Sequence, residues 1–318
     1  MTKTRLLQIG DITDRMRDAL SEHFDIDVLF DQDDRAVFLA KNGAEYPAIL
    51  TNGHWGVPDD VAAATPNLKV VSSYGVGYDA IDAEAYARRG VKVAHTPDVL
   101  NDEVADTFVM LWLAVSRSLI PSDRHARSGK WETEGNYPLT RTVQNRRVGI
   151  LGLGRIGQTI ADRCEAFGAE IHYHSRSKKD VAYTYHDTAK SCAEAVEVLV
   201  AITPGGPSTQ HMVNAEVLQA LGSDGLFFNV ARGSVVDERA LVKALQDGVI
   251  AGAGLDVFEE EPKIPDALKS MDNVVLTPHV ASGTHETRQA MGDLAVGNLT
   301  QWLKDGTVKT PVPECRDL

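Results

Sequence analysis

Three charged or titratable side chains in the second half of the chain follow short apolar segments. Arg232 comes after FFNVA, Glu261 after GLDVFEE and His279 after VVLTP. An arginine in a crevice can bind a carboxylate through two parallel hydrogen bonds. A histidine beside a carboxylate can stay protonated near neutral pH and donate a proton. Together, the three residues could reduce a 2-oxo acid, with an anion clamp and an acid for the oxygen that receives charge.

Each of these residues also has a purely structural interpretation. Arg232 and the glycine after it could form a turn with a surface arginine. Glu261 could belong to a solvated acidic loop, and His279 could be a buried histidine with its hydrogen bonds satisfied. Only their joint occurrence at predicted strand ends favours catalysis, because doubly wound folds bind ligands at that edge of the sheet.

The element that must position these residues begins with VGILGLGRIG, Val148–Gly157. A predicted buried strand leads into the glycine pattern of Gly152, Gly154 and Gly157, and a helix-like segment, Gln158–Phe167, follows. A dinucleotide-binding turn needs this order, since the glycines allow a tight turn, close approach of a pyrophosphate and close helix–strand packing. The N–H groups at the helix start would then hold the phosphate. The alternative is an ordinary turn between a strand and a helix.

The first hundred residues alternate between short strands and short helices, without a glycine fingerprint in the first turn. This alternation predicts a parallel sheet with helices on both faces. The predicted strands are Arg5–Gly10, Phe24–Phe30, Ala48–Asn52, Leu68–Ser73 and Val91–Thr96, and the predicted helices are Thr13–His23, Pro58–Ala64 and Ala83–Arg89.

Two segments separate this first unit from the glycine turn. Asn101–Ile120 is predicted as one long helix that is apolar on nearly all sides, so it should be buried between domains, against a partner subunit, or both. Ser122–Asn145 is polar and is expected to be irregular. It could be an exposed excursion or an arm that clasps a second chain.

A second α/β unit starts at Arg147, and a last long helix is predicted over Glu286–Leu303. We therefore expect a dinucleotide-binding Rossmann domain over residues 101–285, inserted into a substrate (catalytic) domain of residues 1–100 and 286–318. Its six expected strands are Val148–Leu151, Glu170–His174, Val198–Ile202, Leu226–Val230, Gly252–Val257 and Val274–Leu276.

The end of the second strand of this unit predicts the type of dinucleotide. NAD sites usually carry a carboxylate there, for the ribose hydroxyls. This chain has none, and the side chains present could neutralise and hydrogen-bond a 2′-phosphate. We therefore expect NADPH (NADP⁺), while a solvated basic turn that also accepts NADH is the alternative. The residues concerned are Ser175, Arg176, Ser177 and Lys178.

Composition limits the classes of partner. The 32 basic and 45 acidic side chains give a formal charge of −13, which argues against general binding of nucleic acid or anionic membranes. The three cysteines are far apart and form no CxxC pair, so we expect no disulfide, no zinc site and a cytoplasmic location. His172 and His174 could resemble a metal pair, but no third ligand is in view, and sheet packing is the simpler interpretation. No apolar run approaches the length of a membrane span.

The motifs together resemble the D-isomer-specific 2-hydroxyacid dehydrogenase family, over nearly the whole chain and in order. Within it, SRSKK and VADTFVMLWLAVSR are most similar to the glyoxylate/hydroxypyruvate and hydroxyphenylpyruvate reductase branch, which uses NADPH. The resemblance implies two doubly wound domains, the substrate domain flavodoxin-like, and a homodimer. The matching segments are Gly152–Gly157, Asn229–Glu238, Gly254–Pro262, Leu276–Arg288, Ser73–Asp82 and Thr96–Asp106.

The resemblance also assigns roles to individual residues. Arg232, Glu261 and His279 match the catalytic arginine, glutamate and acid/base histidine. The backbone of Val76 and Gly77 matches the loop that binds the substrate carboxylate, with Asn101 close by. The expected cofactor-binding residues are Gly152, Gly154, Arg155, Ile156, Gly157, Ser175, Arg176, Ser177, Lys178, Thr203, Val230 and Asp256, of which Asp256 matches the residue that holds the nicotinamide carboxamide.

Two other functions fit parts of this pattern. One is oxidation of another donor, such as phosphite, by the same residues; formate enzymes usually pair the histidine with glutamine, so Glu261 argues against them. The other is a nucleotide-sensing protein similar to the corepressors that share this fold. The substrate's side chain stays open, since the aromatic residues His54, Trp55, Tyr74 and Tyr78 could line a pocket or belong to the core.

Overall fold

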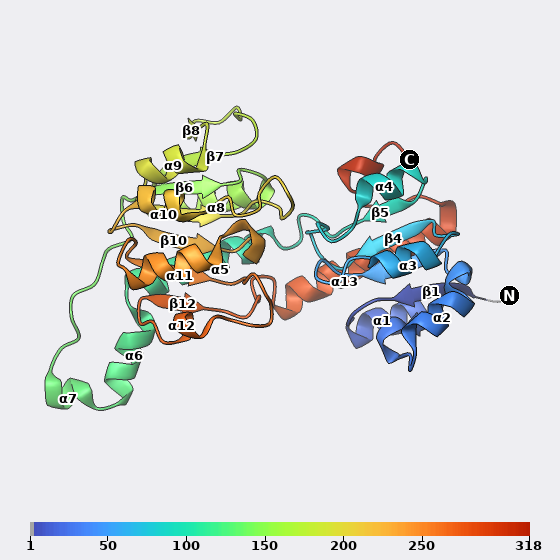
Figure 1. Cartoon of the computed structure of the whole chain (residues 1–318), viewed down its shortest axis with the longest axis horizontal. Coiled ribbons are helices and arrows are strands. Elements are labelled where there is room, and N and C mark those ends of the chain that lie inside the picture. Colours follow the sequence, from blue (N-terminus) through green and yellow to red (C-terminus); the bar gives the residue numbers. More distant parts are fainter. Residues whose placement is uncertain (1–2) are drawn as a thin grey trace. The chain divides into compact units, whose positions relative to one another are not determined.

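The computed structural model describes residues 3–318, which form two compact α/β units (Figure 1). Unit 1 takes in the chain up to Leu100 together with Thr284–Leu318, and unit 2 is Asn101–Gly283. The chain therefore passes back into unit 1 at residue 284, two residues before the boundary expected from the sequence.

Unit 1 contains a five-stranded parallel sheet with the strand order β2-β1-β3-β4-β5. This is the flavodoxin-like order, in which the chain reverses its direction of progress next to β1. The strands are β1 (Thr4–Gln8), β2 (Phe24–Val28), β3 (Ala48–Thr51), β4 (Val70–Ser73) and β5 (Lys92–Ala94).

Helices cover both faces of this sheet, as alternation of strands and helices predicts. α1 (Asp14–Ser21) and α13 (His285–Asp305) lie on one face, where Ser72 of β4 donates a hydrogen bond to Ala295 of α13. The other face packs against α2 (Arg35–Asn42), α3 (Asp59–Ala64), α4 (Ala83–Arg88) and the short 3₁₀ turn η4 (Pro313–Cys315), with further 3₁₀ turns at η1 (Leu29–Asp31) and η2 (Gly43–Glu45).

The sequence pattern did not predict α2. It buries one large side chain, Leu39, so its apolar periodicity is weak. The helix starts because the side chain of Asp34 accepts the Val37 N–H, which satisfies one of the unpaired donors of the first turn.

Unit 2 contains a seven-stranded parallel sheet with the order β12-β11-β10-β9-β6-β7-β8. Counted from β6, this is the 3-2-1-4-5-6 order of the dinucleotide-binding fold with one more strand, so the expected Rossmann architecture is confirmed. The short edge strand β8 was not predicted. The strands are β6 (Arg147–Leu151), β7 (Glu170–His174), β8 (Thr184–His186), β9 (Val198–Ala201), β10 (Leu226–Asn229), β11 (Gly252–Leu255) and β12 (Val274–Leu276).

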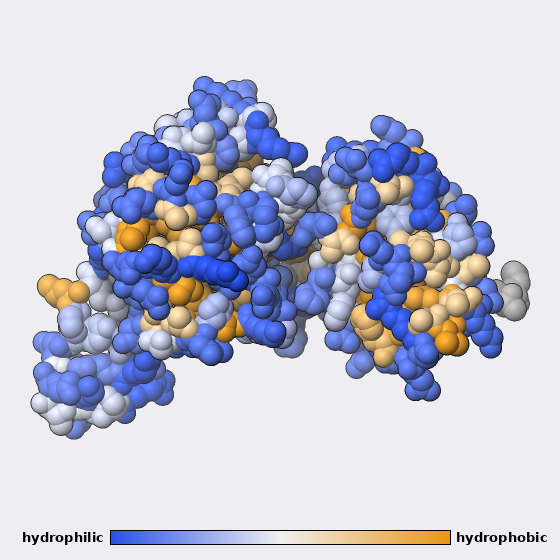
Figure 2. All heavy atoms as spheres, in the orientation of Figure 1, coloured by the Kyte–Doolittle hydropathy of each residue, from blue (hydrophilic) through white to orange (hydrophobic). Residues whose placement is uncertain are grey.

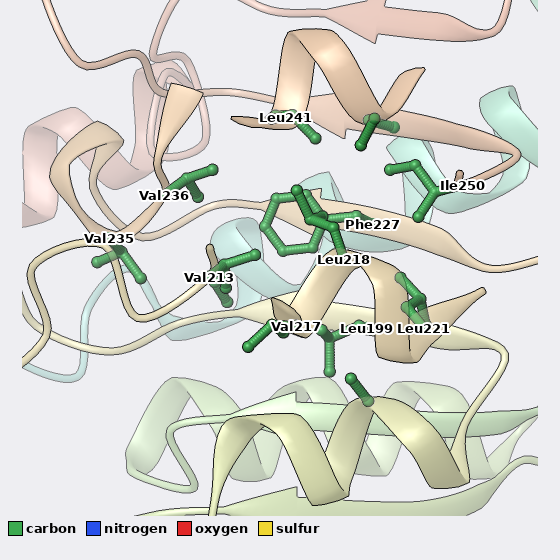
Figure 3. Close-up of a cluster of buried hydrophobic side chains, with 14 of the residues drawn as sticks. Leu199, Val213, Val217, Leu218, Leu221, Phe227, Val235, Val236, Leu241 and Ile250 are labelled. Carbon is green, nitrogen blue, oxygen red and sulfur yellow. The ribbon is translucent and has the colours of Figure 1, made fainter. Parts of the chain in front are cut away.

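The two faces of this sheet are again covered. α5 (Asn101–Ser116) and α8 (Arg155–Glu165) pack together on one face. The other face forms an apolar core around the fully buried Phe227 (Figure 3). That core is closed by α9 (Ala189–Ala195), α10 (Ala215–Leu221) and α11 (Glu238–Gln246), with the 3₁₀ turn η3 (Gly233–Val235) and α12 (Asp266–Lys269) at loop positions.

The expected helix over 101–120 is in fact two helices. α5 ends at Ser116, whose carbonyl accepts the N–H of Arg141, and Ser118 has a left-handed φ of 49°. α6 (Leu119–Arg127) and α7 (Lys130–Glu134) then project away from the rest of unit 2 (Figure 1). The segment expected to be irregular is therefore helical as far as residue 134, with an extended return.

One face of α5 is buried in unit 2, and another exposes apolar side chains. Phe108 and Trp112 are fully buried, whereas Met110 is 47% and Leu113 37% exposed. The view in Figure 2 shows a mainly hydrophilic surface on each unit, with small apolar areas between the charged side chains. Among the described residues no single helix is long and apolar enough to span a membrane; the bent pair α5–α6, whose axes differ by 59°, meets that test by length and composition only.

Candidate active site

The glycine turn after β6 has the geometry that a phosphate requires. Gly152 has a φ of 108°, which glycine adopts without strain. A Cβ on Gly157 would lie 2.1 Å from the Gly152 oxygen, so only glycine lets α8 pack this closely on β6. At Gly154, in contrast, a Cβ would meet no described atom within 4 Å. The space over Gly154 is therefore open to a ligand.

The same turn lies where the strand order reverses, between β6 and β9. Gly152 packs against the backbone of Ile202 and Thr203, which follow β9. Gly154 is the N-cap residue of α8 and provides no side-chain cap, and within residues 3–318 the buried Thr203 hydroxyl has no hydrogen-bond partner. Because buried polar groups are rarely left unpaired, these groups fit a bound dinucleotide.

The loop after β7 presents the basic side chains predicted for a 2′-phosphate. Ser175 is half-buried and donates a hydrogen bond to the Ser177 carbonyl at 2.7 Å. Arg176 and Lys178 are exposed on either side of Ser177. No carboxylate stands at the end of β7, so the loop can accept a dianionic group without like-charge repulsion.

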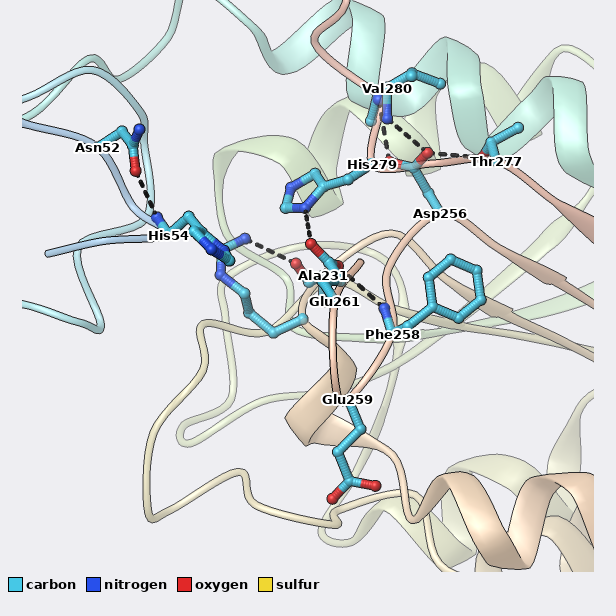
Figure 4. A network of polar contacts seen from close by, with 12 residues as sticks. Asn52, His54, Ala231, Asp256, Phe258, Glu259, Glu261, Thr277, His279 and Val280 are labelled. Atoms are coloured by element: carbon cyan, nitrogen blue, oxygen red, sulfur yellow. Dashed lines mark hydrogen bonds and ion pairs between the residues drawn. The ribbon is translucent and has the colours of Figure 1, made fainter. Parts of the chain in front are cut away.

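His279 and Glu261, in the loops that follow β12 and β11, form a direct pair. The His279 Nδ1 lies 2.8 Å from the Glu261 Oε2, and the other carboxylate oxygen accepts the Phe258 N–H at 3.1 Å (Figure 4). An ionised carboxylate at this contact would accept the hydrogen bond from Nδ1–H of the ring. The histidine side chain is 45% exposed and the glutamate 22%, which leaves the imidazole accessible while its carboxylate is shielded.

Asp256 holds the loop that carries His279. The residue is 1% exposed, and its carboxylate accepts hydrogen bonds from the Thr277 hydroxyl at 2.6 Å and from the N–H groups of Val280 and Ala281 at 2.9 and 3.0 Å. Its carbonyl accepts the His279 N–H, and His279 takes a left-handed φ of 53°. The sequence suggested only a cofactor contact for Asp256. The structure adds a positioning role that depends on residues more than twenty positions away.

Arg232 lies on a turn packed against the Glu261 loop. The Asn229 side chain accepts the Ala231 N–H and donates to the Arg232 carbonyl, at 3.1 and 2.9 Å. A Cβ on Gly233 would lie 1.9 Å from the Phe258 oxygen, so this approach needs glycine. The loops of Arg232, Glu261 and His279 are thus brought together within unit 2, as predicted for a shared sheet edge. Asn229, in the fingerprint NVARG, is a supporting residue that motif reasoning left without a role.

The outer side of the Glu261 loop contacts two further side chains. His211 Nε2 lies 2.8 Å from the Glu259 carboxylate, and Glu238 accepts the Glu259 N–H at 3.2 Å. Partial burial and the neighbouring Glu259 and Glu260 raise the pKa of Glu238. These contacts fix the loop from outside. They were missed because His211 belongs to no recognised motif, and the segment Asn229–Glu238 was not assigned a role for its last residue.

The remaining predicted residues lie at element ends within their own units. In the loop after β4, the Gly75 carbonyl accepts the Thr96 N–H and the Val76 carbonyl contacts the His95 ring. Gly77 is the next residue of this loop. Asn101 is the first residue of α5, and the buried Val230 follows β10.

Of the four aromatic residues, Tyr74 is buried, Tyr78 is half-buried against the unit 1 core, and His54 and Trp55 are exposed. Tyr74 is 8% exposed and its hydroxyl donates to the Arg288 carbonyl. Trp55, 44% exposed, stands 4.7 Å from the Phe30 ring.

His172 and His174 do not form a metal pair with each other. His172 instead contacts His186 of β8, with 2.9 Å between Nδ1 and Nε2. Within residues 3–318 no group of three or more potential ligands is arranged around a metal position.

This combination defines a class of protein. A Rossmann-ordered sheet that combines an open glycine turn with a histidine–carboxylate pair and an arginine after strand ends is the arrangement of a dinucleotide-dependent oxidoreductase.

The comparisons identify the family within that class. The sequence model of the D-isomer specific 2-hydroxyacid dehydrogenase, NAD binding domain, matches residues 109–281. Glyoxylate/hydroxypyruvate reductase A of Arabidopsis thaliana is 41% identical over 98% of this chain and 100% of its own, and hydroxyphenylpyruvate reductase of Plectranthus scutellarioides is 45% identical over 86% and 88%. The chain therefore belongs to the D-isomer-specific 2-hydroxyacid dehydrogenase family, and its fold and recognised resemblance are confirmed.

A solved structure agrees over the full length. The NADPH-dependent glyoxylate/hydroxypyruvate reductase from Sinorhizobium meliloti, crystallised with NADP and malonate, has a TM-score of 0.93 and 46% identity, and covers 99% of this chain and 98% of its own.

Proposed function

We propose that this protein reduces a small 2-oxo acid, such as glyoxylate, hydroxypyruvate or an aryl pyruvate, to the D-2-hydroxy acid with NADPH. The observation that carries the proposal is the 2.8 Å contact between His279 and Glu261 on a sheet with the Rossmann strand order. That pair supplies a proton donor of fixed orientation. The relatives named above support the substrate class, since they are named as reductases of these acids.

In this proposal each catalytic residue has one task. Glu261 fixes the imidazole of His279 through Nδ1, so Nε2 delivers the proton to the substrate's keto oxygen. The guanidinium of Arg232 binds the substrate carboxylate and keto oxygen. Asp256 keeps His279 in place by holding its loop. NADPH, when bound, supplies the hydride for the substrate's C2.

The cofactor assignment rests on groups that fit each part of the dinucleotide. The open space over Gly154 and the uncapped start of α8 would take the pyrophosphate, near Arg155 and Ile156. The Ser175–Lys178 loop would take the 2′-phosphate. The hydroxyl of Thr203 and the backbone at Val230 are further proposed contacts.

The residues outside unit 2 keep the role that the resemblance implies. Val76 and Gly77 would bind the substrate carboxylate through backbone N–H groups, with Asn101 as a polar neighbour of the substrate. We propose accordingly that residues 1–100 and 284–318 form the substrate domain and that residues 101–283 form the cofactor domain.

The test is the rate of NADPH oxidation by the pure protein with glyoxylate, hydroxypyruvate and phenylpyruvate in parallel, repeated with NADH. We expect turnover on at least one acid, with a lower KM for NADPH than for NADH. A protein that binds NADPH tightly but reduces none of the three acids would contradict the proposal and favour a nucleotide sensor.

We also propose that the protein is a cytoplasmic homodimer. Apolar side chains of α5 and α6 line a groove on unit 2, including Met110, Leu113 and Leu119. Burying them against a second copy would be favourable. The three cysteines are buried free thiols, in keeping with a reducing compartment. Leu113→Glu should convert the dimer to a monomer in sedimentation experiments, and a wild-type sedimentation coefficient in that variant would exclude this interface.

A further inference from the structure

The edge of the unit 2 sheet carries a group of rings next to the Ser175–Lys179 loop. β7 and β8 pair in parallel, and their register places Tyr173 beside Tyr185 and His174 beside His186. Successive side chains of a strand point to opposite faces. The two tyrosines therefore share one face of the edge, and the histidines share the other.

The tyrosine face contacts both ends of the loop. Tyr173 is fully buried, and its hydroxyl accepts the Lys179 N–H at 2.8 Å and donates to the Lys179 carbonyl at 3.3 Å. Tyr185 packs against it, with 5.4 Å between ring centroids, and its hydroxyl lies 3.4 Å from the Ser175 carbonyl. The phenol groups thus hold the backbone where the loop begins and where it ends.

The histidine face attaches β8 to β7. The rings of His172 and His186 are stacked at 5.2 Å, and their facing nitrogens, 2.9 Å apart, can share one proton. His172 also contacts the Glu170 carboxylate at 3.1 Å, and the His174 ring contacts the His186 carbonyl. These contacts fix a three-residue edge strand that has few backbone pairs of its own. They hold Tyr185 against Tyr173.

We infer that Tyr173 and Tyr185 are positioning residues for the 2′-phosphate of NADPH. This inference rests on the proposed cofactor. Arg176 and Lys178 are long, exposed side chains on a short loop, and binding a phosphate costs the entropy of ordering them. Ordering the loop backbone adds to that cost, and holding both ends of the backbone in advance removes this part of it. The tyrosine hydroxyls contact backbone atoms of the loop, so in this inference they act on the dinucleotide through the loop and not through contact with it.

The test is Tyr173→Phe, which keeps the buried ring and removes only the hydroxyl. Loss of a neutral hydrogen bond corresponds to about a three- to tenfold change in an equilibrium constant, so the KM for NADPH should rise by about that factor. The KM for NADH and kcat should stay at the wild-type values. Tyr185→Phe should give a smaller change in the same direction, because its hydrogen bond is longer.

A matched control is Tyr86→Phe in unit 1. Tyr86 is also buried, and within residues 3–318 its hydroxyl has no hydrogen-bond partner, so this variant should change neither KM. A second readout is calorimetric titration with adenosine 2′,5′-bisphosphate and with 5′-AMP. Tyr173→Phe should weaken binding of the bisphosphate and leave 5′-AMP unchanged.

The outcomes separate this inference from the proposed function. Equal rises in the KM for NADPH and for NADH, or equal weakening of both nucleotides, would overturn the positioning role and leave a purely structural one. If Tyr173→Phe does not fold, the same comparison of the KM for NADPH with the KM for NADH is made on Tyr185→Phe. A wild-type protein that does not prefer NADPH over NADH would instead contradict the proposed cofactor.

Discussion

The first β–α turns of the two units occupy the same place in two similar parallel sheets, yet one is filled and the other open. In unit 1, a Cβ on Gly10 would lie 2.5 Å from Cδ1 of Trp55, and α1 is capped by the Thr13 side chain. In unit 2, the space over Gly154 is open and α8 has no side-chain cap. The topology is shared, so it does not by itself create a nucleotide site. The side chains in and around the turn decide whether a nucleotide can bind, because they fill or leave open the space for a phosphate.

The loop after β4 in unit 1 differs from the carboxyl edge of the unit 2 sheet in a similar way. Unit 2 presents ionisable side chains there, Arg232, Glu261 and His279, supported by buried polar residues such as Asp256. The loop after β4 in unit 1, Gly75–Gly77, offers only backbone and one valine. The difference predicts that substitutions in unit 2 change kcat or cofactor binding, whereas those in unit 1 change stability or the KM for the acid.

The largest effect is expected at His279. His279→Ala removes the proposed proton donor, and loss of general acid catalysis should lower kcat by about 10²–10⁴-fold. Steady-state rates with saturating NADPH measure this, and NADPH binding by fluorescence serves as the control because it should not change. A variant with wild-type turnover would remove His279 from the mechanism.

Valine at the two turn glycines tests the contrast between the filled and the open turn. Gly154→Val places a side chain where the pyrophosphate would bind, and losing hydrogen bonds to a charged group should raise the KM for NADPH by about 10–100-fold. Gly10→Val adds bulk against Trp55 at a φ of 83°, and should cost about 1–3 kcal/mol of unfolding free energy.

Cofactor titration and thermal melting of both variants measure these effects. Weaker NADPH binding by Gly10→Val, with Gly154→Val unaffected, would reverse the assignment of the two turns.

A smaller change is expected from Arg176→Ala. Removing one charged partner of the 2′-phosphate should raise the KM for NADPH by about tenfold, and the KM for NADH much less. Arg239→Ala, an exposed arginine of α11, is a suitable control. Equal effects of Arg176→Ala on the two cofactors would contradict the phosphate site.

The smallest predicted effect concerns Glu238 and pH. The pKa of Glu238 is raised in the folded protein, so folding favours its protonated form. The resulting stabilisation is fully present below the ordinary glutamate pKa of 4.5 and is lost as the pH rises through the raised pKa. Glu238→Gln should therefore be slightly more stable than wild type at pH 7, by about 0.5 kcal/mol at most, with no gain at pH 4. Thermal melting at the two pH values measures it, and a larger gain at pH 4 would show the opposite sign.

Local patterns in the sequence were sufficient for much of this molecule. Alternating strands and helices predicted two doubly wound units, and the glycine spacing predicted the turn after β6. Charged residues just beyond strand ends predicted the set of Arg232, Glu261 and His279, because parallel strands end at one edge of a sheet. These features depend on residues close together in the chain, which is why they can be read without a structure.

Other features depend on residues distant in the chain, and only the tertiary structure decided them. α5 ends at Ser116 because the returning segment bonds to its last turn, although the apolar pattern continues to Ile120. β8 exists because His186 and Tyr185 pack on β7, although three residues show no periodicity. Asp256 holds the His279 loop through hydrogen bonds, and Gly233 allows close packing against Phe258. Both contacts join loops that are distant in the chain, and no sequence pattern predicts which distant loops will meet.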